Sequence, residues 1–481
     1  MTTLQAGQTI SVQIAEGEVF SVVPSGVAQV SSIGRSGSPL ETPRTFSDAR
    51  GFGPYLESGS LTIACVTGTL VYSRTSRNGI ARIALMGDSI AAQTTDYASV
   101  KRANGPVSWM LARLGQPWYL PRANNFAVGG TSCDVIRANQ LPLVLAAHAA
   151  NPIQRVFMSC GTNDTNSGRT LAAIKDDMTA IFDALLDAGI TPVHHGILPR
   201  GNDGSLTNAK RQNMHLNEWL EWYAYTRGGL EFIDCSLALA NNASAFGNAL
   251  IALTDGTQLH PLDNGAFFMS EIMANYYRAK GIAPQVRFAA NQADQYDATH
   301  NPWGVVFDSP NPLMQGGATA PTGMTCTGGT WACSTRTMSN GQTKPQINCT
   351  LAASTTHFIY DDAVATGGWD TENVREGDWL YGVCELELVN VTNLTSCALE
   401  LVENNGVNTT TAADLSAGSG AIGATGSSLT LYTMTPPIQM RAYGGSGNAS
   451  AFLRQRIING SGETGTARIK GFEMRKWIGE V

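Results

Sequence analysis

The chain has 481 residues, of which 43% are hydrophobic and only 14% charged, so it can form several domains and is not a disordered chain. Its net charge of −7 argues against a nucleic-acid partner, because phosphate binding needs clustered Lys and Arg. No apolar run approaches the roughly 18 residues of a transmembrane helix. Residues 1–10 lack the basic start and apolar core of a signal peptide, so we expect neither membrane insertion nor a secretion signal.

Residues 1–78 are predicted to form an N-terminal β-rich domain. Short runs such as Ile10–Ile14 and Leu61–Val66 alternate or are rich in β-branched residues, and Gly, Ser and Pro separate them. This segment contains few candidate catalytic or ligand-binding residues.

Residues 79–288 change to an alternation of apolar strands and amphipathic helices. Ile83–Met86 and Arg155–Cys160 are typical of buried strands, whereas Leu171–Leu186 places its apolar side chains on one helical face and is followed by Gly189. Alternating strands and helices favour a parallel sheet covered on both faces.

Residues 289–481 again show the sequence pattern of short β-strands and are predicted to form a C-terminal β-sandwich. Strand candidates include Trp379–Val389 and Ala467–Phe472, and no long helical period interrupts them.

The whole chain contains nine cysteines, with no C-x-x-C pair, which argues against a zinc ribbon. Cys326 and Cys333 could form a disulfide, although scattered thiols in a reducing cytoplasm are the preferred interpretation.

Two loops of the middle segment follow apolar strands and carry glycines. Ser89 stands in Gly87-Asp88-Ser89 after Ile83–Met86, at the carboxyl edge of the predicted sheet where ligands bind. Residues 125–131 contain Gly129 and Gly130, where a backbone N–H lies uncovered and can meet an oxyanion. Either motif alone is also compatible with an ordinary Gly-rich turn.

Two further loops carry polar side chains suited to nucleophilic catalysis. Asn163 follows the strand at 156–160, and its neutral amide is a suitable oxyanion donor. His260 lies just before the last predicted helix, where it could act as general base for a serine hydroxyl, and Asp255 could orient it. An Asn-Asp turn and a structural histidine are the alternatives for these loops.

The order and placement of these segments resemble the SGNH hydrolases, also called the GDSL esterase/lipase family, over residues 80–285. Ser89, Gly130 and Asn163 match the first three family blocks, and Gly130 is preferred to Gly129 because the family's glycine falls five residues after the block's asparagine. The fourth block departs from the pattern, since the family's Asp stands three residues before His. Here Asp255 stands five before His260, so either an insertion lets it reach the imidazole or a Ser-His dyad operates.

The resemblance implies a flavodoxin-like three-layer α/β domain that hydrolyses esters without a metal or organic cofactor. Ser89 would be the nucleophile and His260 its general base. The backbone N–H groups of Ser89 and Gly130 and the Asn163 amide would form the oxyanion hole.

The flanking segments favour a carbohydrate-binding role, since a hydrolase domain does not need them for chemistry. Trp303, Trp331 and Trp369 could stack on sugars, with core packing as the alternative. The layout resembles bacteriophage tail or tailspike esterases, which implies removal of O-acetyl groups from a bacterial surface polysaccharide, and a homotrimer in a virion or another extracellular setting. A bacterial carbohydrate esterase outside phages and a non-catalytic receptor-binding virion protein with a decayed site stay open as alternatives.

Overall fold

The strands and helices predicted between residues 79 and 288 form a parallel α/β sheet in the computed structural model, which confirms the predicted fold class. Four parallel strands lie in the order β9 (Ala81–Gly87), β13 (Ile153–Ser159), β14 (Thr191–His194) and β15 (Glu231–Phe232). Their interior residues are buried, as expected for a sheet with helices on both faces.

The structure describes residues 2–14, 20–25, 27–34, 39–46, 50–52, 59–74, 81–93, 95–96, 101–103, 105–201, 207–241, 248–255, 257–282, 284–286, 288–289, 292, 294–295, 304–306, 311–338, 343–365, 374–415, 422–445, 449–460 and 464–477. The chain divides into two units, the first consisting mainly of Met1–Ala81 and the second of Arg82–Gln116 with Leu120–Trp477. Within the described ranges, no helix has the length and apolar character needed to cross a bilayer.

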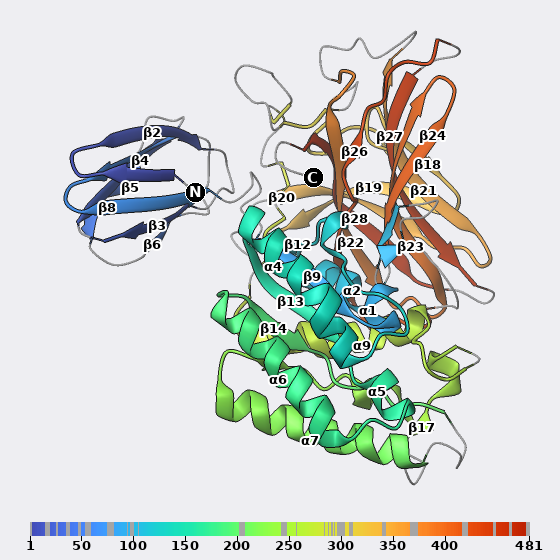
Figure 1. The fold of residues 1–481 in the computed structure, drawn as a ribbon. Helices are drawn as coiled ribbons and strands as arrows, with labels where there is room; N and C mark the ends of the chain where they lie inside the picture. Colours follow the sequence, from blue (N-terminus) through green and yellow to red (C-terminus); the bar gives the residue numbers. More distant parts are fainter. Residues whose placement is uncertain are drawn as a thin grey trace. The chain divides into compact units, whose positions relative to one another are not determined.

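The first unit contains two antiparallel four-stranded sheets (Figure 1). One has the order β1-β8-β3-β6 and the other β2-β7-β4-β5. Buried residues such as Val30 and Ile63 lie between less buried neighbours along the strands. The strands are β1 (Thr2–Gln5), β2 (Thr9–Ile14), β3 (Phe20–Pro24), β4 (Ala28–Gly34), β5 (Pro39–Phe46), β6 (Arg50–Phe52), β7 (Gly59–Cys65) and β8 (Thr69–Arg74).

The helices of the second unit cover both faces of its parallel sheet. Val156 and Met158 of β13 belong to a core shared with α4, α6 and α7, while the intervening Phe157 contacts Tyr277 of α9 edge-to-face. The helices of this region are α1 (Ser89–Ala92), α2 (Pro106–Leu114), α3 (Cys133–Val135), α4 (Leu141–Ala150), α5 (Thr162–Asn166), α6 (Leu171–Asp187), α7 (Thr207–Arg227), α8 (Ser236–Leu239) and α9 (Asp263–Ala279).

Short elements connect these strands and helices. They are the strands β10 (Thr95–Asp96), β11 (Lys101–Ala103), β12 (Trp118–Tyr119), β16 (Ala240–Asn241) and β17 (Asn248–Ala249), the 3₁₀ turns Arg122–Asn124 and Ile251–Leu253, and a π-helical turn, Ile136–Gln140.

The C-terminal strands form two further sheets that enclose a hydrophobic core. One has the order β10-β11-β24-β23-β27-β21-β18 and the other β19-β20-β28-β22-β25, with β26 beside β22. The strands are β18 (Thr325–Thr327), β19 (Thr330–Thr337), β20 (Thr343–Thr350), β21 (Thr356–Ala365), β22 (Trp379–Val389), β23 (Leu394–Asn405), β24 (Thr409–Asp414), β25 (Leu429–Met434), β26 (Ile438–Gln439), β27 (Ala449–Asn459) and β28 (Thr466–Lys476).

The sandwich and the α/β region both lie in the second unit (Figure 1), and they share one hydrophobic core. Trp109 and Ala112 of α2 and Phe267 of α9 belong to the same buried cluster as the sandwich strands. Gln116 donates a 2.8 Å hydrogen bond to the Tyr432 carbonyl of β25, and β11 pairs in parallel with β24. The α/β region is thus structurally continuous with the sandwich.

Candidate active site

The turn after β9 places Ser89 at the carboxyl edge of the parallel sheet. Gly87 has φ of +136°, and a Cβ there would lie 2.1 Å from the Ser159 carbonyl oxygen, so only glycine fits. Asp88 then begins α1, because its carboxylate accepts hydrogen bonds from the Ile90 N–H at 3.0 Å and the Ser159 hydroxyl at 2.8 Å. This turn presents Ser89 as the first residue of α1.

Ser89, His260 and Asp255 form a hydrogen-bonded chain. The His260 Nε2 atom lies 2.8 Å from Ser89 Oγ, and His260 Nδ1 lies 2.8 Å from Asp255 Oδ2. The two side chains of the His-Asp pair are 23% and 31% exposed, so the site is open to solvent on this side. A hydroxyl, an imidazole and a carboxylate in this order are equipped for proton transfer from the hydroxyl to the imidazole.

The five-residue spacing between Asp255 and His260 is accommodated by a loop that wraps around the carboxylate. Asp255 Oδ1 accepts hydrogen bonds from the Thr257 hydroxyl at 2.7 Å and from the N–H groups of Thr257, Leu259 and His260 at 3.1–3.3 Å. Gln258 adopts a φ of +55°, which tightens the turn. The geometry therefore brings Asp255 to the imidazole despite the departure from the family spacing.

The pKa of Asp255 reflects this surrounding set of donors. Partial burial alone would raise the pKa of the carboxyl. The hydrogen bonds from Thr257, His260 and the loop backbone outweigh burial and hold its pKa well below the usual range. Asp255 is therefore a carboxylate at neutral pH, which suits a residue that must keep a proton on His260 Nδ1.

The loop with Gly129 and Gly130 borders Ser89, and the Asn163 side chain is hydrogen-bonded to that loop. A Cβ at Gly129 would lie 3.6 Å from the Ser89 Cβ, while Gly130 has φ of +79° and open space beside it. Asn163 is the second residue of α5, which begins after Gly161, and its Nδ2 donates a 3.0 Å hydrogen bond to the Thr131 carbonyl. An amide NH2 has two donors, so one remains for a ligand.

Two residues that sequence reasoning did not single out, Gln140 and Arg169, help to hold these loops in register, together with Asp164, which was expected to support its turn without taking part in the chemistry. Gln140 accepts from the Gly87 N–H at 2.7 Å and donates to the Gly87 carbonyl at 2.9 Å. Asp164 is fully buried, accepts from the Cys133 N–H and pairs with Arg169. In the sequence, Gln140 stands four residues after Ile136 and just before Leu141. This position does not reveal whether the glutamine is buried or exposed.

The buried carboxyl of Asp88 lies next in sequence to Ser89. Burial raises its pKa to about 6, partly opposed by the hydrogen bonds from Ser159 and Ile90. Its Oδ2 atom has no hydrogen-bond partner among the described residues. This carboxyl is therefore protonated far more readily than an exposed aspartate.

The predicted sugar-stacking tryptophans have different outcomes. Trp331 is only 6% exposed, belongs to the sandwich core and donates its indole N–H to Gly328, so the hypothesis that it stacks on sugars is wrong. It alternates with exposed residues along β19, which turns its side chain inward. Trp303 and Trp369 lie outside the described residues. Cys326 and Cys333 are both free thiols.

Comparison with known proteins finds one family model that matches this part of the chain. Residues 85–266 match the model of the GDSL-like Lipase/Acylhydrolase family, and no curated protein matches the chain. The chain is similar to a solved member of the lipolytic G-D-S-L family from Veillonella parvula, at 19% identity over 41% of this chain and 98% of that one, with a TM-score of 0.32.

Two further solved structures match a similar share of the chain. A GDSL-like lipase from Bacteroides thetaiotaomicron is 14% identical over 41% of this chain and 88% of its own, with a TM-score of 0.32. A carbohydrate esterase family 3 protein from Talaromyces cellulolyticus is 17% identical over 42% and 98%, with a TM-score of 0.30.

Proposed function

We propose that residues 85–266, which form a GDSL-like acylhydrolase domain, act as a serine esterase that removes O-acetyl groups from a polysaccharide. The observation that carries this proposal is the hydrogen-bonded chain from Ser89 through His260 to Asp255, with both contacts at 2.8 Å. The same hydrogen-bonded chain argues against a decayed site, because the five-residue spacing still permits the contact between Asp255 and His260.

The reaction would proceed by acyl transfer to Ser89 and then to water. Ser89 Oγ attacks the ester carbonyl carbon while its proton passes to His260 Nε2. The oxyanion is held by the N–H groups of Ser89 and Gly130 and by the Asn163 amide. His260 returns the proton to the departing sugar oxygen, and water then attacks the acyl-enzyme, giving acetate and free Ser89.

The exposure of the site and the β-rich regions around it support a substrate in which the acyl group lies on the surface of a large polymer. The partly exposed His260 and Asp255 side chains leave the ester chemistry accessible from solvent. The sandwich shares a buried core with α2 and α9, so the catalytic loops and the sandwich belong to one compact unit. The low charge and the antiparallel β-rich flanks further support our proposal that the protein is a phage tail component acting on a bacterial surface glycan.

Acetate release tests the enzymatic proposal directly. The wild-type protein is assayed on 4-nitrophenyl acetate and on several O-acetylated polysaccharides, beside Ser89→Ala and the control Ser167→Ala, which alters an exposed serine after α5. We expect Ser89→Ala to lose more than about a thousandfold in rate and Ser167→Ala to match wild type. A folded wild-type protein that releases no acetate from any substrate would contradict the proposal.

A further inference from the structure

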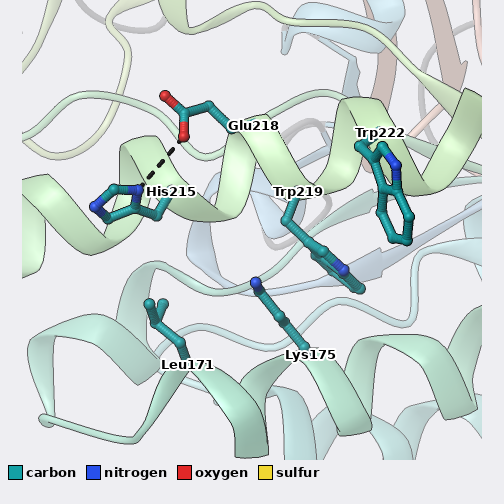
Figure 2. Close-up of a pocket in the computed structure, with 6 residues that line it drawn as sticks. All are labelled: Leu171, Lys175, His215, Glu218, Trp219 and Trp222. Carbon is teal, nitrogen blue, oxygen red and sulfur yellow. Dashed lines mark hydrogen bonds and ion pairs between the residues drawn. The ribbon is translucent and has the colours of Figure 1, made fainter.

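A surface pocket lies between α6 and α7, outside the loops that carry Ser89, Asn163 and His260. We propose that it binds a pyranose ring of a polysaccharide, as a subsite for the polymer whose esters the proposed function cleaves. The pocket has a volume of about 440 Å³, which suits a small ligand. Figure 2 shows two lining residues on α6 and four on α7: Leu171, Lys175, His215, Glu218, Trp219 and Trp222.

The two tryptophans have different roles in the pocket. Trp219 is fixed, because its ring stacks on Tyr223 with centroids 5.1 Å apart and Lys175 Nζ lies 5.4 Å from its centroid. Trp222 is 59% exposed, so a large aromatic surface is left in water. The electron-rich face of an indole attracts the weakly positive C–H groups of a sugar ring, which makes Trp222 a stacking platform.

The polar residues around this platform favour a sugar over an apolar partner. The Lys175 ammonium lies beside the Trp219 ring, and Figure 2 shows its side chain rising from α6. On the rim, Glu218 Oε2 lies 3.4 Å from His215 Nδ1. An apolar surface would desolvate these groups without replacing their hydrogen bonds, whereas sugar hydroxyls can both donate to a carboxylate and accept from an ammonium.

The helix that carries the platform is also tied to the candidate active site. Asn213 of α7 accepts a 2.7 Å hydrogen bond from the Thr165 hydroxyl of α5, and α5 carries Asn163. Trp222 follows Asn213 by nine residues, which is about 14 Å along a helix. A short oligosaccharide covers such a span, so a polymer engaged at Trp222 can extend along α7 to the point where that helix contacts the helix of Asn163.

Affinity electrophoresis tests the subsite independently of catalysis. The Ser89→Ala protein, which cannot turn over its ligand, is run in native gels containing an O-acetylated bacterial capsular polysaccharide or an O-acetylated O-antigen polysaccharide. We expect at least one polymer to retard it, and Trp222→Ala in the same background to weaken the apparent affinity about tenfold. Tyr225→Ala is the matched control, since Tyr225 is an 89% exposed aromatic residue on α7 outside the pocket lining.

Equal retardation of the Trp222→Ala and Tyr225→Ala proteins would overturn the subsite, as would free migration of the parent protein in both gels. In the chain with Ser89 intact, Trp222→Ala should hydrolyse 4-nitrophenyl acetate at the wild-type rate and show a raised KM only on the polymer. Retardation that depends on Trp222 in a protein without esterase activity would support the subsite while refuting the proposed function.

Discussion

Replacing Asp255 with Asn should cost far more activity than loss of one carboxylate charge suggests. Asp255 Oδ1 faces three backbone N–H groups, so the amide oxygen of an asparagine must occupy that position. Its NH2 group then points at His260 Nδ1, where Asp255 Oδ2 now lies at 2.8 Å. A donor at Nδ1 forces the imidazole proton onto Nε2, and a protonated Nε2 cannot accept the Ser89 proton.

The size of the effect follows from the exposure of the pair. A carboxylate-to-amide change in a buried serine-protease triad lowers kcat by about 10⁴. Here the two side chains are 23% and 31% exposed, and water can replace part of the lost interaction. We therefore expect kcat on 4-nitrophenyl acetate to fall by roughly 10³-fold, or about 4 kcal/mol of transition-state stabilisation.

Thr257→Val is the matched control for this measurement. It removes the 2.7 Å hydroxyl contact to Oδ1 and leaves the carboxylate against the imidazole, so kcat should stay within about threefold of wild type. A folded Asp255→Asn protein that keeps more than about a tenth of the wild-type kcat would refute the tautomer reasoning.

Three further predictions concern the turns around Ser89. Asn163→Ala should lower kcat by about 10²–10³ with little change in KM, measured by steady-state kinetics; an effect on KM alone would contradict an oxyanion role. Gly87→Ala places a Cβ 2.1 Å from the Ser159 oxygen at φ of +136° and should lower the free energy of unfolding by about 3 kcal/mol, checked by urea titration; a loss under about 1 kcal/mol would contradict it. Burial raises the pKa of Asp88 from 3.8 to about 6, so the folded state binds its proton more tightly and loses about 3 kcal/mol of stability as pH rises between these values. Subtracting urea titrations of Asp88→Asn from those of wild type should isolate that slope, and identical slopes would disprove it.

Elements with a clear period could be predicted from the sequence, because their pattern is local. The apolar face of Leu171–Leu186 and the following Gly189 gave a helix that the structure places at Leu171–Asp187. The contact between Asp255 and His260 was left open, because it depends on the path of a loop. That path is set by backbone N–H groups that converge on one carboxylate oxygen and by the positive φ of Gln258.

Contacts between distant segments could not be predicted from the same patterns. Every residue of α2 is buried, which indicates a helix enclosed on all sides, yet nothing in its sequence says that the sandwich encloses it. The inward orientation of Trp331 likewise depends on the register of β19 against β20, in which it pairs with Cys349. The register of a strand is fixed by its pairing with another strand, so the local sequence around Trp331 does not reveal which way its side chain faces.

The shared core has a consequence for synthesis on the ribosome. Trp109 and Phe267 emerge before any strand from β18 onward, so the nascent α/β region exposes apolar surface that only later residues cover. At about 5–20 residues per second, translating residues 289–477 takes roughly 10–40 s. During that interval the nascent chain offers a binding surface to chaperones and to neighbouring chains on the same message. Slower translation across the sandwich should therefore increase aggregation.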